Sequence, residues 1–72
     1  MKNRSTKLVS PVIRALRLTR RINDITLVEL AGAAGISVAY LCQVERGDRQ
    51  ADADLQARLF TALEQITKDG HN

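Results

Sequence analysis

The chain has 72 residues, a formal net charge of +3 and one cysteine, and 44% of its residues are hydrophobic. This length allows one small domain, and a lone cysteine excludes both a disulfide framework and a zinc cluster. The apolar runs are too short to cross a bilayer, and the basic N-terminus lacks the apolar core of a signal peptide, so we expect a cytoplasmic protein with no membrane partner.

Charge is distributed unevenly along the chain. Residues 1–21 contain seven bases and no acid, whereas residues 50–72 contain four acids and two bases. A basic end of this kind would attract a polyanion, although a solvated basic arm on an ordinary helical protein has the same composition. Charge therefore supports a nucleic-acid partner without establishing one.

The first predicted element follows a polar, basic stretch, residues 1–9, which we expect to be a flexible arm. Ser10 and Pro11 form a helix start, with serine as N-cap and proline at the first helical position. The helix should continue to about Arg21, and Asn23 with Asp24 should end it. Its predicted apolar stripe consists of Val12, Leu16, Thr19 and Ile22, with Ile13 and Ala15 beside it.

Two short helices are predicted next, over residues 26–47. Thr26 and Glu29 have the spacing of a capping box, which begins a helix reaching about Ala34. Gly35 should end that helix, because the backbone after a helix commonly turns left-handed. A third helix should begin after Ser37, its N-cap, and end in the same way at Gly47, with apolar residues buried on both helices: Leu30, Ala31, Ala34, Leu41 and Val44.

The last predicted helix follows a polar loop, residues 47–51, and begins at either Asp52 or Asp54. Apolar residues at spacings of three and four should face the core: Leu55, Leu59, Ala62, Leu63 and Ile66. Residues 68–72 are expected to be a frayed tail, and no segment has a strand pattern. The sequence thus predicts an all-α domain over residues 10–67, with four helices and a fifth as the alternative.

The two short helices could be a plain helical hairpin or a unit whose second helix lies across the first. Two features favour the second arrangement. The small side chain of Ala31 permits a close crossing, and the outward face of the third helix lacks the usual Glu and Lys residues. That face instead carries Val38, Ala39, Gln43 and Arg46, which suit thymine methyls, adenine edges and phosphates.

At these positions the chain resembles the helix-turn-helix repressors of the phage Cro and lambda-repressor type, with their relatives among restriction-modification controllers and antitoxins. The resemblance covers roughly residues 12–66. It rests on Thr26, Glu29-Leu30-Ala31, Gly35-Ile36-Ser37, Tyr40-Leu41, Gln43-Val44-Glu45-Arg46-Gly47, and the helix containing Leu55, Leu59 and Leu63. The chain departs from the family at Leu27, where a phosphate-anchoring glutamine is common, and in lacking a proline near residue 51.

The resemblance implies a role for each matching residue. Val38, Ala39 and Gln43 would read base edges in the major groove. The implied phosphate contacts are Thr26, Ser37, Tyr40, Arg46, Arg49 and Gln50. Glu45 would form a structural ion pair with an arginine of the first helix, which is Arg20 by family spacing and Arg17 by the alternative alignment.

These residues favour a regulator of transcription, expected to be a repressor, that binds a palindromic double-stranded DNA operator as a homodimer. One short recognition helix reads about four base pairs, so two copies would be needed for a genomic site. Phe60 lies off the core stripe of the last helix and either forms the dimer contact or folds over the edge of the core. The alternative is a helical protein–protein module.

The sequence contains no catalytic motif, no set of metal-binding residues and no glycine-rich phosphate-binding loop. We therefore expect no enzyme activity, no cofactor and no small-molecule ligand. Cys42 is expected to be a packed small residue rather than a redox group, and His71 a residue of the tail.

Overall fold

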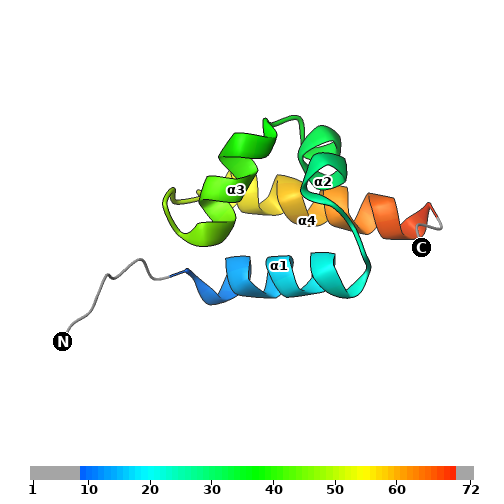
Figure 1. Cartoon of the computed structure of the whole chain (residues 1–72), viewed down its shortest axis with the longest axis horizontal. Coiled ribbons are helices and arrows are strands. Elements are labelled where there is room, and N and C mark those ends of the chain that lie inside the picture. The colour runs from blue at the N-terminus through cyan, green and yellow to red at the C-terminus, as the bar shows by residue number, and fades with distance from the viewer. Residues whose placement is uncertain (1–8, 70–72) are drawn as a thin grey trace.

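A computed structural model describes residues 9–69, and this part of the chain forms four α-helices and no strand. They are α1 (Pro11–Ile22), α2 (Leu27–Ala34), α3 (Val38–Arg46) and α4 (Ala53–Lys68) (Figure 1). The prediction of a four-helix, all-α domain is confirmed. Residues 1–8 of the expected arm and 70–72 of the expected tail, which include His71, lie outside the described residues.

Each helix begins at a polar N-cap whose side chain accepts a hydrogen bond from a backbone N–H three residues later. Ser10 and Ser37 cap α1 and α3, with Oγ to nitrogen distances of 3.2 and 3.0 Å. At α2 the capping box is complete, because Thr26 accepts from the Glu29 N–H and the Glu29 carboxylate accepts from the Thr26 N–H. Asp52 rather than Asp54 caps α4, accepting from the Leu55 N–H at 2.8 Å.

Glycines end α2 and α3 in the left-handed conformation that the sequence predicts. Gly35 has φ 76° and Gly47 has φ 87°. Asp24, in the loop after α1, also has a positive φ of 56°, which aspartate tolerates better than most residues. The turns between helices are therefore set by residues that accept this backbone geometry.

Two glycines on α2 and its cap allow a matched test of this account. Gly35→Ala should lower the free energy of unfolding by about 1–2 kcal/mol, because a Cβ strains a left-handed residue. Gly32→Ala should raise it by roughly 0.5–1 kcal/mol, since Gly32 is helical and nothing lies within 4 Å of an added Cβ. Urea denaturation of both variants measures the difference. Equal effects of the two substitutions would contradict the assigned turn.

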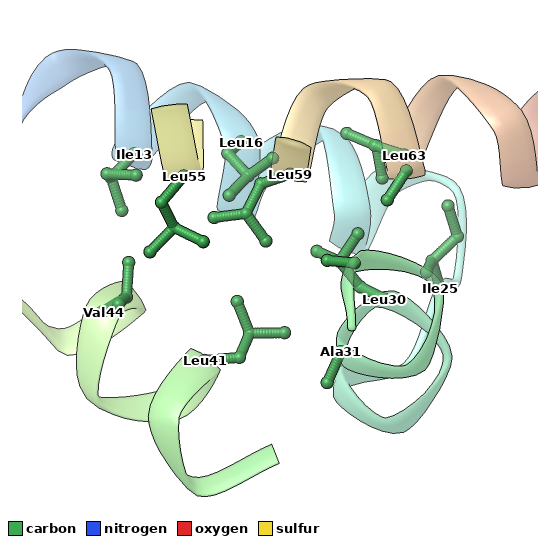
Figure 2. Packing of buried hydrophobic residues seen from close by; sticks show 12 residues of the cluster. Ile13, Leu16, Ile25, Leu30, Ala31, Leu41, Val44, Leu55, Leu59 and Leu63 are labelled. Carbon is green, nitrogen blue, oxygen red and sulfur yellow. The ribbon is translucent and has the colours of Figure 1, made fainter. Parts of the chain in front are cut away.

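The core lies where the four helices face one another (Figure 2). α2 packs most extensively against α4, and α1 contacts both α3 and α4. The fully buried large side chains are Leu16, Ile25, Leu30, Leu41, Val44 and Leu59. All are aliphatic, in a chain that contains only one Tyr, one Phe and no Trp. Ile25 comes from the loop between α1 and α2 and closes one end of this core.

The predicted stripe of α1 is wrong in part. Ile13 and Leu16 are buried, but Val12 and Ile22 are 42% and 70% exposed, and Ala15 and Thr19 are exposed as well. The reason is that α1 turns Ile13, Leu16 and Arg20 inwards, and residues at this spacing share one helix face. Ile22 therefore lies with Ala15 and Leu18 on the opposite, outward side of the helix.

The boundaries of the domain also differ slightly from those predicted. Val9, assigned to the arm, is half-buried and packs against the core. α4 continues to Lys68, with Asp69 as its C-cap, so the helix takes in a residue assigned to the tail. Each difference extends the folded unit by one residue. At the N-terminal end Val9 gains apolar contact with the core, and at the C-terminal end Lys68 continues the helix.

Candidate nucleic-acid interface

The most distinctive feature of the fold is the way α2 and α3 are joined. Residues 35–37 connect them, and the two helices differ in direction by 108°. The Ile36 N–H donates to the carbonyl of Ala31 at 3.0 Å, which folds the turn back onto α2. Ala31, 1% exposed, has the small side chain that lets α3 approach. α3 consequently lies along one edge of the molecule (Figure 1).

Arg58 of α4 holds the end of α2 in place, a role that no local sequence pattern indicates. Its Nη2 donates to the carbonyl of Ala34 at 2.9 Å. The last carbonyls of a helix lack partners within the helix, so an arginine there satisfies one of them and complements the helix dipole. A basic residue is a common partner for a helix end, but this one is 24 positions away in sequence.

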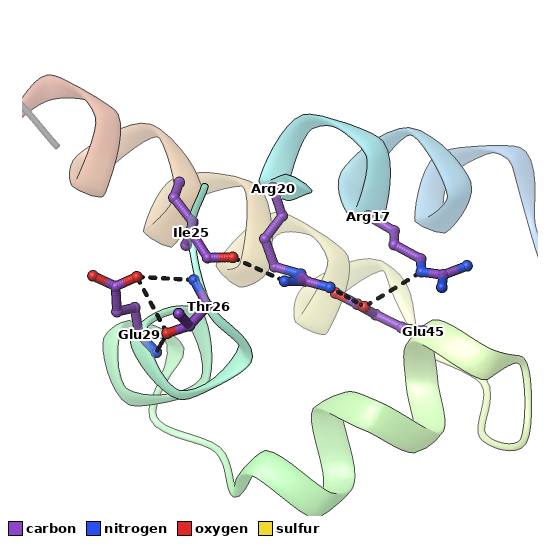
Figure 3. A network of polar contacts seen from close by, with 6 residues as sticks. All are labelled: Arg17, Arg20, Ile25, Thr26, Glu29 and Glu45. Carbon is purple, nitrogen blue, oxygen red and sulfur yellow. Dashed lines mark hydrogen bonds and ion pairs between the residues drawn. The ribbon is translucent and has the colours of Figure 1, made fainter. Parts of the chain in front are cut away.

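The inner face of α3 is fixed to α1 by a buried ion pair (Figure 3). Arg20 donates from Nε to Oε2 of Glu45 at 2.8 Å and from Nη2 to Oε1 at 3.0 Å. Its Nη1 donates to the carbonyl of Ile25, also at 2.8 Å. Glu45 is 4% exposed, so this carboxylate depends on Arg20 for its stability in the core.

Arg17, the alternative partner, makes a weaker contact with the same carboxylate. Its Nε lies 3.9 Å from Oε1 of Glu45, and its side chain is 53% exposed compared with 12% for Arg20. Arg20 therefore forms the bidentate pair, and Arg17 lies at its margin. The pair ties the C-terminal part of α3 to the end of α1 and to the loop that leads into α2.

The outer face of α3 carries the three residues expected to read bases. Val38 is 39% exposed, Ala39 is exposed and Gln43 is half-buried. Two expected phosphate contacts lie at helix starts, where the hydroxyls of Thr26 and Ser37 already serve as caps. Each can contribute to an anion site through the start of its helix, where backbone N–H groups and the helix dipole favour negative charge.

Gln43 is linked to two residues that were assigned separately to phosphates. Oε1 of Gln43 accepts a hydrogen bond from Nε of Arg49 at 2.8 Å. The guanidinium carbon of Arg49 lies 5.3 Å from the centre of the Tyr40 ring, within the range of a cation–π contact. The structure thus brings Tyr40, Gln43 and Arg49 into one cluster.

Arg46 is paired with Asp48 just beyond the end of α3. Nε and Nη2 of Arg46 donate to Oδ2 of Asp48 at 3.0 and 2.6 Å. The hydrogen bond and the negative charge of Asp48 raise the pKa of Arg46 above its ordinary value. A phosphate would have to compete with Asp48 for this guanidinium group. Gln50, the remaining expected phosphate contact, is exposed in the same loop.

Phe60 on α4 and three arginines on α1 are exposed outside the α3 surface. Phe60 is 37% exposed on α4, where Ala53 and Ala57 are also exposed. Beside it, a groove of about 350 Å³ runs between α2 and α4, and its lining includes Ala33, Ala57 and Thr61. The side chains of α1 that face solvent include three basic residues, Arg14, Arg17 and Arg21.

Comparison with known protein families, with curated proteins and with solved structures found no match for this chain. Over residues 9–69, no single helix has both the length and the apolar character needed to cross a membrane; only α2 and α3 taken together, bent by 108°, meet that requirement by length and composition.

Proposed function

We propose that this protein is a transcriptional regulator of the Cro and lambda-repressor type that binds double-stranded DNA, represses transcription, and reads the major groove with α3. The observation that carries the proposal is the 108° angle between α2 and α3 across the short turn at residues 35–37. Helices of DNA-binding helix-turn-helix units are joined at about 90–120° by such turns. The second helix then enters the groove while the first crosses the backbone.

The chemistry of the exposed α3 surface fits this function. Val38 and Ala39 offer short apolar contacts, while Gln43 and the nearby Arg49 offer polar groups. The inner face, in contrast, is fixed by Leu41, Val44 and the buried Glu45. A helix anchored on one side and exposed on the other can be presented to DNA without rearrangement of the fold.

Two copies would be needed to read an operator, and α4 offers a surface for pairing. A two-fold contact is made by the same patch on both copies, so the patch must complement itself, as a projection beside a matching recess does. Phe60 supplies the projection, and the groove lined by Ala33, Ala57 and Thr61 supplies the recess. We therefore propose a homodimer in which Phe60 of each copy packs on the α2–α4 groove of the other.

Phe60→Ala should give a folded monomer that binds DNA weakly and recognises only half of the operator. The phenyl ring is the largest apolar group on this patch, and aromatic residues commonly dominate such contacts. Sedimentation equilibrium measures the state of association, and Leu18→Ala is the matched control, because Leu18 is 60% exposed on the outward side of α1. A dimeric Phe60→Ala variant, or a monomeric wild type at high concentration, would place the interface elsewhere or exclude it.

A helical protein–protein module is the second candidate function. The observation in its favour is the outward side of α1, where Leu18 and Ile22 are 60% and 70% exposed. Exposed apolar groups of this size are suited to a protein partner. Such an adaptor would show no salt-dependent affinity for DNA, whereas a DNA-binding protein must lose affinity as salt rises.

Selection of bound sequences from random duplexes tests the proposed function. The wild-type chain should enrich a palindrome whose half-sites are separated by one helical turn, about 34–36 Å between centres. Arg46→Ala should weaken binding to all sequences to a similar degree, because a phosphate contact carries no base information. If a folded wild-type chain enriches no sequence, the proposal of a sequence-specific regulator fails.

A further inference from the structure

The cluster of Tyr40, Gln43 and Arg49 constrains how Gln43 can meet a base. Arg49 follows α3, and its backbone N–H donates to the carbonyl of Gln43 at 3.3 Å, so the loop folds back over the last turns of the helix. Its guanidinium group lies over Tyr40 and donates from Nε to the Gln43 side chain at 2.8 Å. Arg49 is thus positioned by its own backbone, by an aromatic ring and by the amide that it binds.

This contact fixes the orientation of the Gln43 amide. An arginine has hydrogen-bond donors and no acceptor, so the atom of Gln43 that faces it must be the carbonyl oxygen. A glutamine reads adenine by accepting from the N6 amino group with that oxygen while it donates to N7 with its nitrogen. Here Arg49 donates to that oxygen and takes one of its two lone pairs, while the NH₂ group remains as the donor for a base.

The Gln43 amide and the Arg49 guanidinium group therefore offer hydrogen-bond donors and a positive charge to DNA. Bases with acceptors in the major groove match such a surface better than bases with donors. Guanine presents two acceptors in the major groove, N7 and O6, whereas adenine presents one acceptor and one donor. Cytosine presents a donor, and thymine an acceptor beside a methyl group. The N6 amino group of adenine would have to share the Gln43 oxygen with Arg49 and lie beside its positive charge. Guanine is the base with the best complement to this cluster.

We propose that Gln43 and Arg49 act together to specify guanine, with Arg49 as the positioning residue that determines what Gln43 reads. The inference rests on the proposed function, since it concerns a DNA-binding surface. It changes the role expected from sequence, in which Gln43 suited an adenine edge and Arg49 contacted the phosphate backbone. Arg49 then influences base choice as well as affinity.

Competition binding with the full chain and a set of duplexes tests the proposal. The position read by Gln43 is first identified as the one whose base preference is lost in Gln43→Met. At that position the wild type should prefer guanine over adenine by about tenfold or more, the range expected for one good base contact. Arg49→Met keeps a long side chain but frees the amide oxygen, so the preference should move to adenine at the same position.

Arg46→Met is the matched control, because it removes the same charge from the same surface without touching Gln43. It should reduce affinity for every duplex and leave the preference for guanine intact. Circular dichroism checks that each variant keeps its helices.

A wild-type preference for adenine at this position, or a preference for guanine that persists in Arg49→Met, would overturn the inference while leaving DNA binding intact. The inference would also fail if Gln43→Met changed no base preference. Failure of the wild type to distinguish any duplex would instead overturn the proposed function, and this inference with it.

Discussion

Arg20→Ala should lower the free energy of unfolding by about 3–5 kcal/mol, the usual result of leaving a buried charge without its partner. Glu45 is 4% exposed, and Arg20 supplies both of its short hydrogen bonds. The variant also loses the bond from Arg20 to the Ile25 carbonyl, which supports the loop between α1 and α2. Small domains are stable by only about 5–15 kcal/mol, so the loss removes a large part of the total.

A thermal melt measures this loss, and a decrease of roughly 12 °C or more is expected for a domain of this size. Arg17→Ala is the matched control on the same helix, since the Arg17 side chain is 53% exposed and lies 3.9 Å from the carboxylate. Its melt should lie close to that of the wild type. A wild-type melt for Arg20→Ala, or equal losses for both variants, would contradict the assignment of the pair.

Replacing both members of the pair separates the cost of a lone buried charge from the value of the pair. The double variant Arg20→Met with Glu45→Leu buries no charge at this site. It should recover much of the stability that Arg20→Ala loses, because apolar groups of similar volume often replace a buried pair at little cost. If the double variant is as unstable as Arg20→Ala, the loss comes from packing instead.

The largest expected effect on binding is that of Ala39→Glu. Ala39 is exposed at the start of α3, on the face proposed to enter the major groove. A carboxylate there would face the phosphates and base acceptors, and like charges brought together at an interface cost several kcal/mol. Specific affinity should therefore fall by at least about a hundredfold. The fold should persist, because an acid in the first turn of a helix is favourable.

The local architecture of this protein is readable from short stretches of sequence. The capping box at Thr26 and Glu29 and the cap at Ser37 involve residues three positions apart, and Gly35 meets a requirement of its own backbone. Such features need no knowledge of the rest of the fold. They fix where α2 and α3 begin and end, and hence the turn on which the proposed function depends.

Contacts between distant segments were harder to foresee. The sequence left Arg17 and Arg20 as alternatives, because the choice depends on the rotation of α1 against α3. The same rotation exposes Ile22, which its spacing had placed in the core. The bond from Arg58 to the end of α2 likewise requires α4 to lie against that helix. In each case the outcome depends on how two helices pack against each other. The spacing of apolar residues along one helix does not predict this.

In the candidate site, too, local features were predicted from the sequence and contacts between separate segments were not. Spacing along α3 predicted which residues share its outer face, and Val38 and Ala39 are exposed there. The link between Gln43 and Arg49 depends on the path of the loop after Gly47, which returns over the helix through backbone hydrogen bonds to the Gln43 carbonyl. The resemblance implied separate roles for these two side chains, whereas their geometry joins them.

The proposal that α3 reads DNA is tested most directly by comparing Ala39→Glu with Ala15→Glu. Fluorescence anisotropy measures the affinity of each variant for the duplex enriched by the wild type and for a scrambled duplex, over a range of salt concentrations. Both variants change the net charge equally at an exposed alanine, but Ala15 lies on α1, outside the proposed interface. We expect wild type and Ala15→Glu to prefer the enriched duplex and to lose affinity steeply as salt rises, while Ala39→Glu loses the preference. Equal behaviour of the two variants, or wild-type binding that does not depend on salt, would contradict the proposal that α3 reads DNA.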